Sequence, residues 1–146
     1  MNSWLEITHL IYTYALYIDQ GKLGKAAELF THATIKIPGP IEPADHKAFL
    51  QLLQKVVIIY PDGTPKTRHL INNPMIEINE ELGRATATST FTVLQQTDDM
   101  PLQIIATGYY NDRFERHDGS WRFSHRESTL PHIYGNIHQH INFAAQ

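Results

Sequence analysis

The sequence predicts an α+β fold in which a curved antiparallel sheet carries helices on one face and encloses a pocket. The main observation is the stretch from Arg84 to Glu127, which has the pattern of three long strands in series. Its first strand alternates two unlike sets of side chains with a period of two, as a pleated strand does. One set is Ala85, Ala87, Ser89, Phe91 and Val93, and the other is Thr86, Thr88, Thr90, Thr92 and Leu94. Helical stretches precede these strands, which favours helices packed on the sheet.

Three helices are expected before the long strands. Ser3 and Glu6 have the spacing of a capping box, so the first helix should begin near Trp4 and end before Gly21. Apolar side chains at helical spacing should form its buried face. They are Ile7, Leu10, Ile11, Tyr14, Ala15 and Ile18. A shorter helix is expected over residues 22–30 and a third over residues 44–55.

Two more strands complete the expected layout. Residues 33–38 should form a short strand, and residues 66–79 a longer one that breaks at Asn73-Pro74. In the longer strand His69 shares a face with Thr67 and Ile71. The apolar run 56–60 fits either a helix end or a strand.

The pair Asp118-Gly119 is a strong signal for a hairpin between the last two strands. If this hairpin has no bulge, Phe114 lies opposite Phe123 and Asp112 lies opposite His125. The second pair would then be a polar link on the sheet surface. Arg126 is expected to be structural, pairing with a carboxylate or a loop.

Composition sets limits on function. The chain has 146 residues, which predicts one domain over residues 1–146 with a C-terminal tail over residues 128–146. The net charge of -3 without a basic stripe argues against nucleic-acid binding, and the lack of cysteine excludes disulfides and thiolate metal sites. No run approaches the roughly 18 apolar residues of a membrane span. Because no secretory signal is evident either, a cytoplasmic protein is expected. His138 and His140 form a His-x-His pair, but without a third ligand it would be a weak metal site, so none is predicted.

The order of short motifs resembles the SnoaL-like branch of the NTF2-like superfamily. These motifs are Tyr14-x4-Asp19, Thr67-x-His69, Gly108-x-Tyr110-x-Asp112 and Asp118-Gly119-Ser120-Trp121-Arg122-Phe123-x-x-Arg126. That branch includes polyketide cyclases, scytalone dehydratase and bile-acid dehydratases, with steroid isomerases more distant. The resemblance spans Trp4 to Glu127. It implies a cone-shaped barrel, in which a strongly curved mixed or antiparallel sheet and about three N-terminal helices enclose an apolar pocket. It also implies a homodimer or a higher homo-oligomer.

The resemblance implies three catalytic residues. In many members of the branch, a carboxylate on the first helix orients a histidine on the strand after the loop, and Asp19 and His69 match these positions. Tyr14 matches a tyrosine that often hydrogen-bonds the substrate oxygen. The dehydratases usually place a second acid–base group on the next long strand. This chain departs from that pattern, since the region carries Thr88, Thr90 and Thr92 and no histidine or aspartate.

These residues suit proton transfer next to a carbonyl of a small apolar substrate. His69 would be the general base, Asp19 would fix its tautomer, and Tyr14 would donate to the developing enolate oxygen. The pocket aromatics are expected to be Tyr110, Phe91, Phe114 and Trp121. Isomerisation, dehydration or aldol-type cyclisation would follow without a metal or organic cofactor. Taken singly, His69 and Tyr14 are also compatible with structural roles. The alternatives are therefore a non-catalytic protein that binds a hydrophobic ligand, or a structural subunit like the small subunits of ring-hydroxylating dioxygenases.

Overall fold

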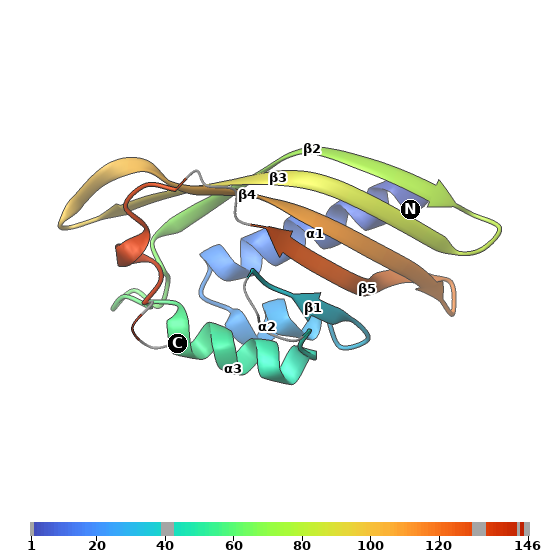
Figure 1. Ribbon diagram of the computed structural model, residues 1–146, viewed down its shortest axis with the longest axis horizontal. Helices are drawn as coiled ribbons and strands as arrows, with labels where there is room; N and C mark the ends of the chain where they lie inside the picture. The colour runs from blue at the N-terminus through green and yellow to red at the C-terminus, as the bar shows by residue number, and fades with distance from the viewer. Residues whose placement is uncertain (1, 39–42, 130–133, 143, 145–146) are drawn as a thin grey trace.

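The α-helices lie on one side of a curved sheet, which confirms the α+β class (Figure 1). The computed structural model describes residues 2–38, 43–129, 134–142 and 144. The helices are α1 (Ser3–Asp19), α2 (Leu23–Glu28) and α3 (His46–Val56), with a 3₁₀ turn, η1 (Ile137–Gln139). The strands are β1 (Thr34–Lys36), β2 (Thr67–Asn79), β3 (Arg84–Thr97), β4 (Met100–His117) and β5 (Ser120–Thr129).

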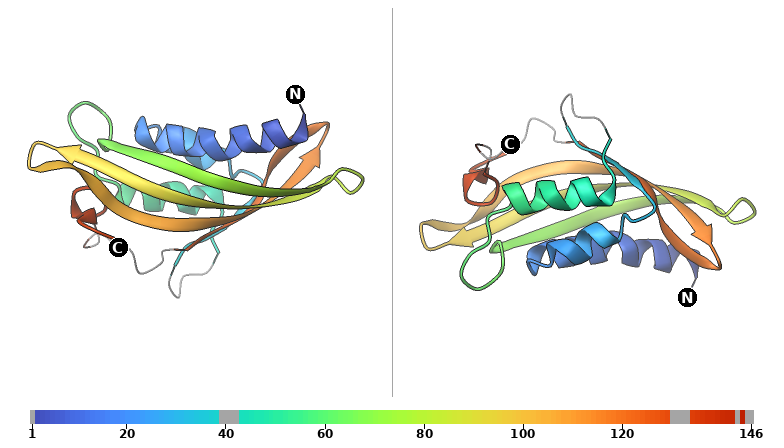
Figure 2. Two further views of the ribbon diagram at one scale, coloured as in Figure 1. Left: turned by 90° about the horizontal axis from the view of Figure 1, so that it is seen from above. Right: turned by 90° about the horizontal axis from the view of Figure 1, so that it is seen from below.

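The described strands form one mixed sheet in the order β1-β5-β4-β3-β2. Only the short β1 runs parallel to its neighbour β5, and the other pairs are antiparallel. The sheet curves around the helices without closing on itself (Figure 2). Register shifts occur in all three antiparallel pairs, and such bulges bend a strand and increase its twist. The result is an open, cone-like arrangement, as the resemblance implies, with α1 running beside β2.

The alternation expected in β3 is confirmed. The buried set faces the helices, and the threonines Thr86, Thr88, Thr90 and Thr92 lie on the other, outer face of the sheet. The interior is therefore not lined by Thr88, Thr90 and Thr92. Its inward positions in that region are Ser89, Phe91 and Val93, none of which titrates near neutral pH.

Helix boundaries differ in detail from the expected ones. Asn2, not Ser3, is the N-cap of α1, and its side chain accepts a hydrogen bond from the Leu5 N–H at 2.8 Å. The capping-box assignment is wrong because Glu6 is used elsewhere, accepting a hydrogen bond from the Trp121 N–H. Helix α2 is shorter than expected, and α3 begins after the N-cap Asp45. Of the undecided run 56–60, only the first residue is helical.

The hairpin pairing is half confirmed. Phe114 lies opposite Phe123 as expected, but Asp112 lies opposite Arg126 and not His125. The reason is a register shift between Arg113 and Phe114, which moves the partner by one residue. The surface link is thus replaced by a buried ion pair, with Arg126 Nε 2.7 Å from Asp112 Oδ1 and Nη2 2.9 Å from Oδ2. The structural role expected for Arg126 is confirmed.

The core fills the space between the helices and the inner face of the sheet. Ile7, Ile11 and Phe30 from the helical layer are fully buried against Phe114 and Phe123 from the sheet. Among the described residues, no helix is long and apolar enough to cross a membrane.

Candidate active site

A cavity of about 300 Å³ lies between the helices and the inner face of the sheet. Its wall is mostly aliphatic, with contributions from α1, α3, β3, β4 and the C-terminal segment. Polar atoms come from Tyr14, His69, Tyr110, Ser128 and His140. A small apolar space with a few polar groups is typical of a site for a small molecule.

Asp19 and His69 meet at the wall of this cavity. His69 Nδ1 lies 2.6 Å from Asp19 Oδ1, and the His69 backbone N–H donates to Oδ2 at 2.7 Å. The two side chains are only 9% and 8% exposed. Asp19 ends α1, where the helix dipole disfavours a carboxylate, so its position requires donors from outside the helix.

Thr67 supplies the third donor, a role that its place in the Thr67-x-His69 motif did not predict. Its hydroxyl donates to Asp19 Oδ1 at 2.8 Å, from the same face of β2 that carries His69. Burial alone would raise the pKa of Asp19, but the hydrogen bonds and charge of His69, with the bond from Thr67, outweigh burial and lower it. An ionised carboxylate can only accept, so Nδ1 of His69 carries the hydrogen and Nε2 is left without one in the neutral ring.

The loop after α1 holds Asp19 in place. Gly21 adopts a φ of 73°, and a Cβ there would lie 2.0 Å from the carbonyl oxygen of Gly63. Gly63 belongs to the loop that leads into β2. The absence of a side chain at Gly21 therefore lets the end of α1 approach the start of β2, which brings the carboxylate to the histidine.

Two tyrosines lie on another part of the same wall. The rings of Tyr14 and Tyr110 meet edge to face with centroids 6.0 Å apart, and Phe91 stacks on Tyr110 at 4.6 Å. The Arg126 guanidinium lies 3.8 Å from the Tyr110 ring centroid and 4.5 Å from that of Tyr14. Burial raises the pKa of both hydroxyls, although the charge of Arg126 opposes it. Both tyrosines therefore stay protonated near neutral pH and can donate hydrogen bonds.

His140 is the cavity residue whose role the sequence did not indicate. Its ring centroid lies 6.0 Å from that of His69, with the planes at 73°. Burial, reinforced by the charge of His69, lowers the pKa of His140 to about 3, so its imidazole is neutral. Ile137 and Ile141 also line the cavity. Their spacing of four residues was the one sequence pattern that could have indicated a buried face in this segment. His138 is exposed, and within the described ranges no three His, Asp or Glu side chains gather to hold a metal ion.

Comparison with known proteins decides the family, since the SnoaL-like domain pattern matches residues 1–127. The chain belongs to the SnoaL-like family. No curated protein matches its sequence.

Solved structures similar to this SnoaL-like chain include three from Novosphingobium aromaticivorans. An NTF2-like protein with a cystatin-like fold has a TM-score of 0.70 and 19% identity, covering 96% of this chain and 84% of its own. A putative scytalone dehydratase has a TM-score of 0.65 and 23% identity, covering 90% and 89%. The beta subunit of a putative aromatic-ring-hydroxylating dioxygenase has a TM-score of 0.67 and 22% identity, covering 88% of each chain. At these identities the likeness shows the shared fold.

The structure brings five of the seven expected site residues of this SnoaL-like domain to one place. His69, Tyr14, Tyr110 and Phe91 line the cavity, and Asp19 lies directly behind His69.

Phe114 and Trp121 lie outside that lining. Phe114 faces the same side of β4 as Tyr110, but four residues of extended strand separate them by roughly 13 Å. It packs instead on Phe123 at 4.7 Å. Trp121 lies near the start of β5, with the Arg116 guanidinium 5.3 Å from its ring centroid.

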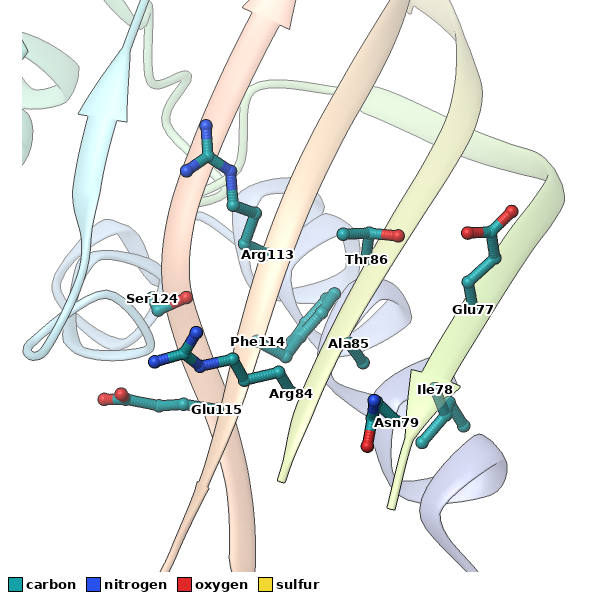
Figure 3. Close-up of a pocket in the computed structure, with 10 residues that line it drawn as sticks. All are labelled: Glu77, Ile78, Asn79, Arg84, Ala85, Thr86, Arg113, Phe114, Glu115 and Ser124. Carbon is teal, nitrogen blue, oxygen red and sulfur yellow. The ribbon is translucent and has the colours of Figure 1, made fainter. Parts of the chain in front are cut away.

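A second hollow of about 600 Å³ lies on the outer face of the sheet. Figure 3 shows the charged side chains of Glu77, Arg84, Arg113 and Glu115 on this face, whereas Phe114 points to the helical side. Its charged groups lie on an open surface, away from the paired carboxylate and imidazole. The inner cavity is therefore the candidate active site of the SnoaL-like domain.

Proposed function

We propose that this protein is a small-molecule enzyme that performs acid–base chemistry on a neutral, apolar substrate containing a carbonyl group. The reaction would be an isomerisation, a dehydration or an aldol-type cyclisation. The observation that carries the proposal is the Asp19–His69 pair, buried at the wall of a cavity that Tyr14 also lines. Each of these reactions begins with the same step, the removal of a proton from the carbon next to a carbonyl.

His69 acts as the base in this scheme. Its Nε2 takes the proton from the carbon, the C–H electrons form the C=C bond of the enolate, and the carbonyl π electrons move to oxygen. Asp19 stabilises the resulting imidazolium through the hydrogen bond to Nδ1. A positioned base of this kind contributes roughly 10²–10⁴-fold to a rate.

Tyr14 stabilises the enolate oxygen. Its hydroxyl is protonated because burial raises its pKa, and Tyr110 can reinforce it from β4. A donor held in a water-poor cavity strengthens as charge develops on the oxygen. The proton held by His69 is then returned in one of three ways. It is delivered to another carbon of the enolate, to a hydroxide that the enolate expels, or to the alkoxide that forms when the enolate attacks a second carbonyl. None of these steps requires a metal or an organic cofactor.

Proton exchange tests the proposal most directly. A panel of small neutral ketones, beginning with 1-tetralone, is incubated in D₂O, and loss of the signal of the protons next to the carbonyl is followed by NMR. The natural chain should accelerate exchange, and His69→Gln and Asp19→Asn should each lose most of that acceleration. His117→Gln is the matched control, since His117 is an exposed histidine at the β4–β5 hairpin. Acceleration that survives in both cavity variants would exclude this pair as the reactive centre.

A second candidate is a non-catalytic protein that binds a hydrophobic ligand, or a structural subunit. The likeness to a dioxygenase beta subunit supports the subunit alternative. It predicts ligand binding without proton exchange and with little change in Asp19→Asn. For a subunit it also predicts co-purification with a larger iron-containing chain.

A further inference from the structure

The buried pair of Asp112 and Arg126 needs an explanation other than stability. The two residues are 2% and 1% exposed, and two hydrogen bonds join the guanidinium to the carboxylate. Burying two charges costs free energy, and apolar side chains of similar volume in such a place are often no less stabilising. The guanidinium is also not fully satisfied, since its Nη1 has no hydrogen-bond partner among the described residues. A role beyond packing would account for the pair.

The guanidinium of Arg126 lies among four aromatic rings. Its distance to the ring centroid is 3.8 Å for Tyr110, 4.5 Å for Tyr14, 5.1 Å for Phe123 and 5.2 Å for Phe30. A cation at such a distance from a ring face is attracted to the electrons of the ring. Tyr14 and Tyr110 line the inner cavity, whereas Arg126 does not. Arg126 therefore influences a bound molecule from behind the two tyrosines, without touching it.

The ion pair is oriented with its positive end toward the tyrosine hydroxyls. Burial has the largest effect on the pKa of Tyr14 and of Tyr110, and raises it. Of the two charges in the pair, Arg126 lowers the pKa of each hydroxyl by more than Asp112 raises it. This order fits the geometry, because the rings pack on the guanidinium while the carboxylate binds its Nε and Nη2 edge. A negative charge that forms near these hydroxyls is therefore attracted by the pair.

A fixed dipole of this kind can stabilise charge that develops during a reaction. It is already in place, so no protein group has to reorganise when an oxygen atom of the bound molecule becomes negative. The surroundings are buried, which strengthens electrostatic interactions. Asp19 is the opposing charge at the cavity wall, and it is hydrogen-bonded to His69 on another part of that wall.

We infer that the Asp112–Arg126 pair is a positioning element, which holds the rings of Tyr14 and Tyr110 and, through their hydroxyls, stabilises an oxyanion in the cavity. That this oxyanion is an enolate rests on the proposed function. Stabilisation of a bound oxyanion as such depends only on the ion pair and the two tyrosines, so it can be tested without turnover.

The probe is 4-nitrophenol, because its phenolate absorbs at a longer wavelength than its neutral form and the molecule is small enough for the cavity. The acid dissociation constant of the bound probe is measured from absorbance against pH, on the natural chain and on Asp112→Leu/Arg126→Met. The double variant removes both charges together and leaves neither unpaired, so it is expected to fold. The constant of the bound probe should fall about tenfold in the double variant, which is the low end of what one nearby charge contributes.

A second ion pair on the same two strands supplies the matched control. Glu115 and Arg122 are cross-strand partners on β4 and β5, with Arg122 Nε 2.9 Å from Glu115 Oε1, but they lie on the outer face of the sheet. Glu115→Gln/Arg122→Met should leave the constant of the bound probe unchanged. A constant that falls by less than about twofold in Asp112→Leu/Arg126→Met, or that falls equally in the control, would overturn the inference.

A measurement on the natural chain covers the case in which the double variant does not fold. The Nε–H of Arg126 is buried and donates to Asp112, so its NMR signal can be followed. This signal should shift as the bound probe ionises, with the same midpoint in pH as the absorbance, whereas the Nε–H signal of Arg122 should not. An Arg126 signal that does not follow the ionisation would overturn the inference. A response of the probe without acceleration of ketone exchange would contradict the proposed function alone, so the two failures are distinguishable.

Discussion

Replacing Asp19 by Asn should switch the tautomer of His69 with almost no change in shape. The carboxylate accepts three hydrogen bonds, at Oδ1 from the Thr67 hydroxyl and His69 Nδ1, and at Oδ2 from the His69 backbone N–H. The backbone donor cannot turn away, so the asparagine oxygen must stay opposite it. The new NH₂ group then faces Nδ1, which has to give up its hydrogen and become an acceptor. Nε2 carries the hydrogen instead and can no longer act as a base.

The size of the effect follows from what the reactive tautomer would lose. For Nε2 of His69 to be basic in the variant, Nδ1 must keep its hydrogen and point it at the NH₂ group of the new asparagine. The hydrogen bond from Nδ1 to the Asp19 carboxylate, which is charge-assisted, is then lost. Such a bond contributes about 2 kcal/mol, which corresponds to about thirtyfold in rate. The lost stabilisation of the imidazolium adds to this, so we expect at least about thirtyfold slower ketone exchange.

The assay combines exchange rates with the ¹⁵N shifts of the His69 ring, which distinguish the two tautomers. The natural chain should show hydrogen on Nδ1 and the variant should show it on Nε2. A variant that keeps hydrogen on Nδ1, or exchanges ketone protons at the natural rate, would refute this account of the pair.

Three further predictions concern stability, and each can be measured by denaturant unfolding. Burial lowers the pKa of His140 from 6.5 in the unfolded chain to about 3 in the folded chain, so the free energy of unfolding should fall by up to about 1.4 kcal/mol for each pH unit as the pH falls through that range. His140→Leu should remove this contribution to the pH dependence, and an unchanged pH dependence would contradict the prediction. Asp112→Asn should lower the free energy of unfolding by about 3–5 kcal/mol because it leaves Arg126 buried without its counter-charge. A decrease of less than 1 kcal/mol would contradict this prediction. Gly21→Ala should destabilise the fold by more than the roughly 1–2 kcal/mol that a left-handed backbone costs a residue with a Cβ, because that Cβ would also meet Gly63. The control is Gly24→Ala in α2, whose Cβ would meet open space and which should be neutral or stabilising. Equal effects of the two changes would argue against the close approach at Gly21.

The sequence predicted those features that local patterns encode. The alternation in β3 identified its buried face, because a half-buried strand repeats every two residues. The family spacing from Tyr14 to Asp19 and on to His69 matched residues that the structure places together. The expected homo-oligomer stays a prediction.

Features that depend on tertiary context were missed. The bulge beside Phe114 carries no sequence signal, and it moved the partner of Asp112 from His125 to Arg126. Asn2 and Ser3 are both good caps; the helix uses Asn2, and Glu6 accepts a hydrogen bond from the distant Trp121 N–H. Phe114 and Trp121 are aromatic like the cavity residues, but only three-dimensional strand geometry shows how far along the sheet they lie. His140 reaches the cavity through long-range hydrogen bonds that no local pattern reveals.

The position of the C-terminal segment has a consequence for how relatives could diverge. The SnoaL-like pattern stops at residue 127, yet Ile137, His140 and Ile141 complete the cavity beyond it. In the proposed function, the proton-transfer pair lies within the matched pattern, whereas one part of the cavity wall lies beyond it. Exchanging residues 134–142 between relatives would change the shape of the cavity, and so the molecules that fit it, without changing Asp19 or His69.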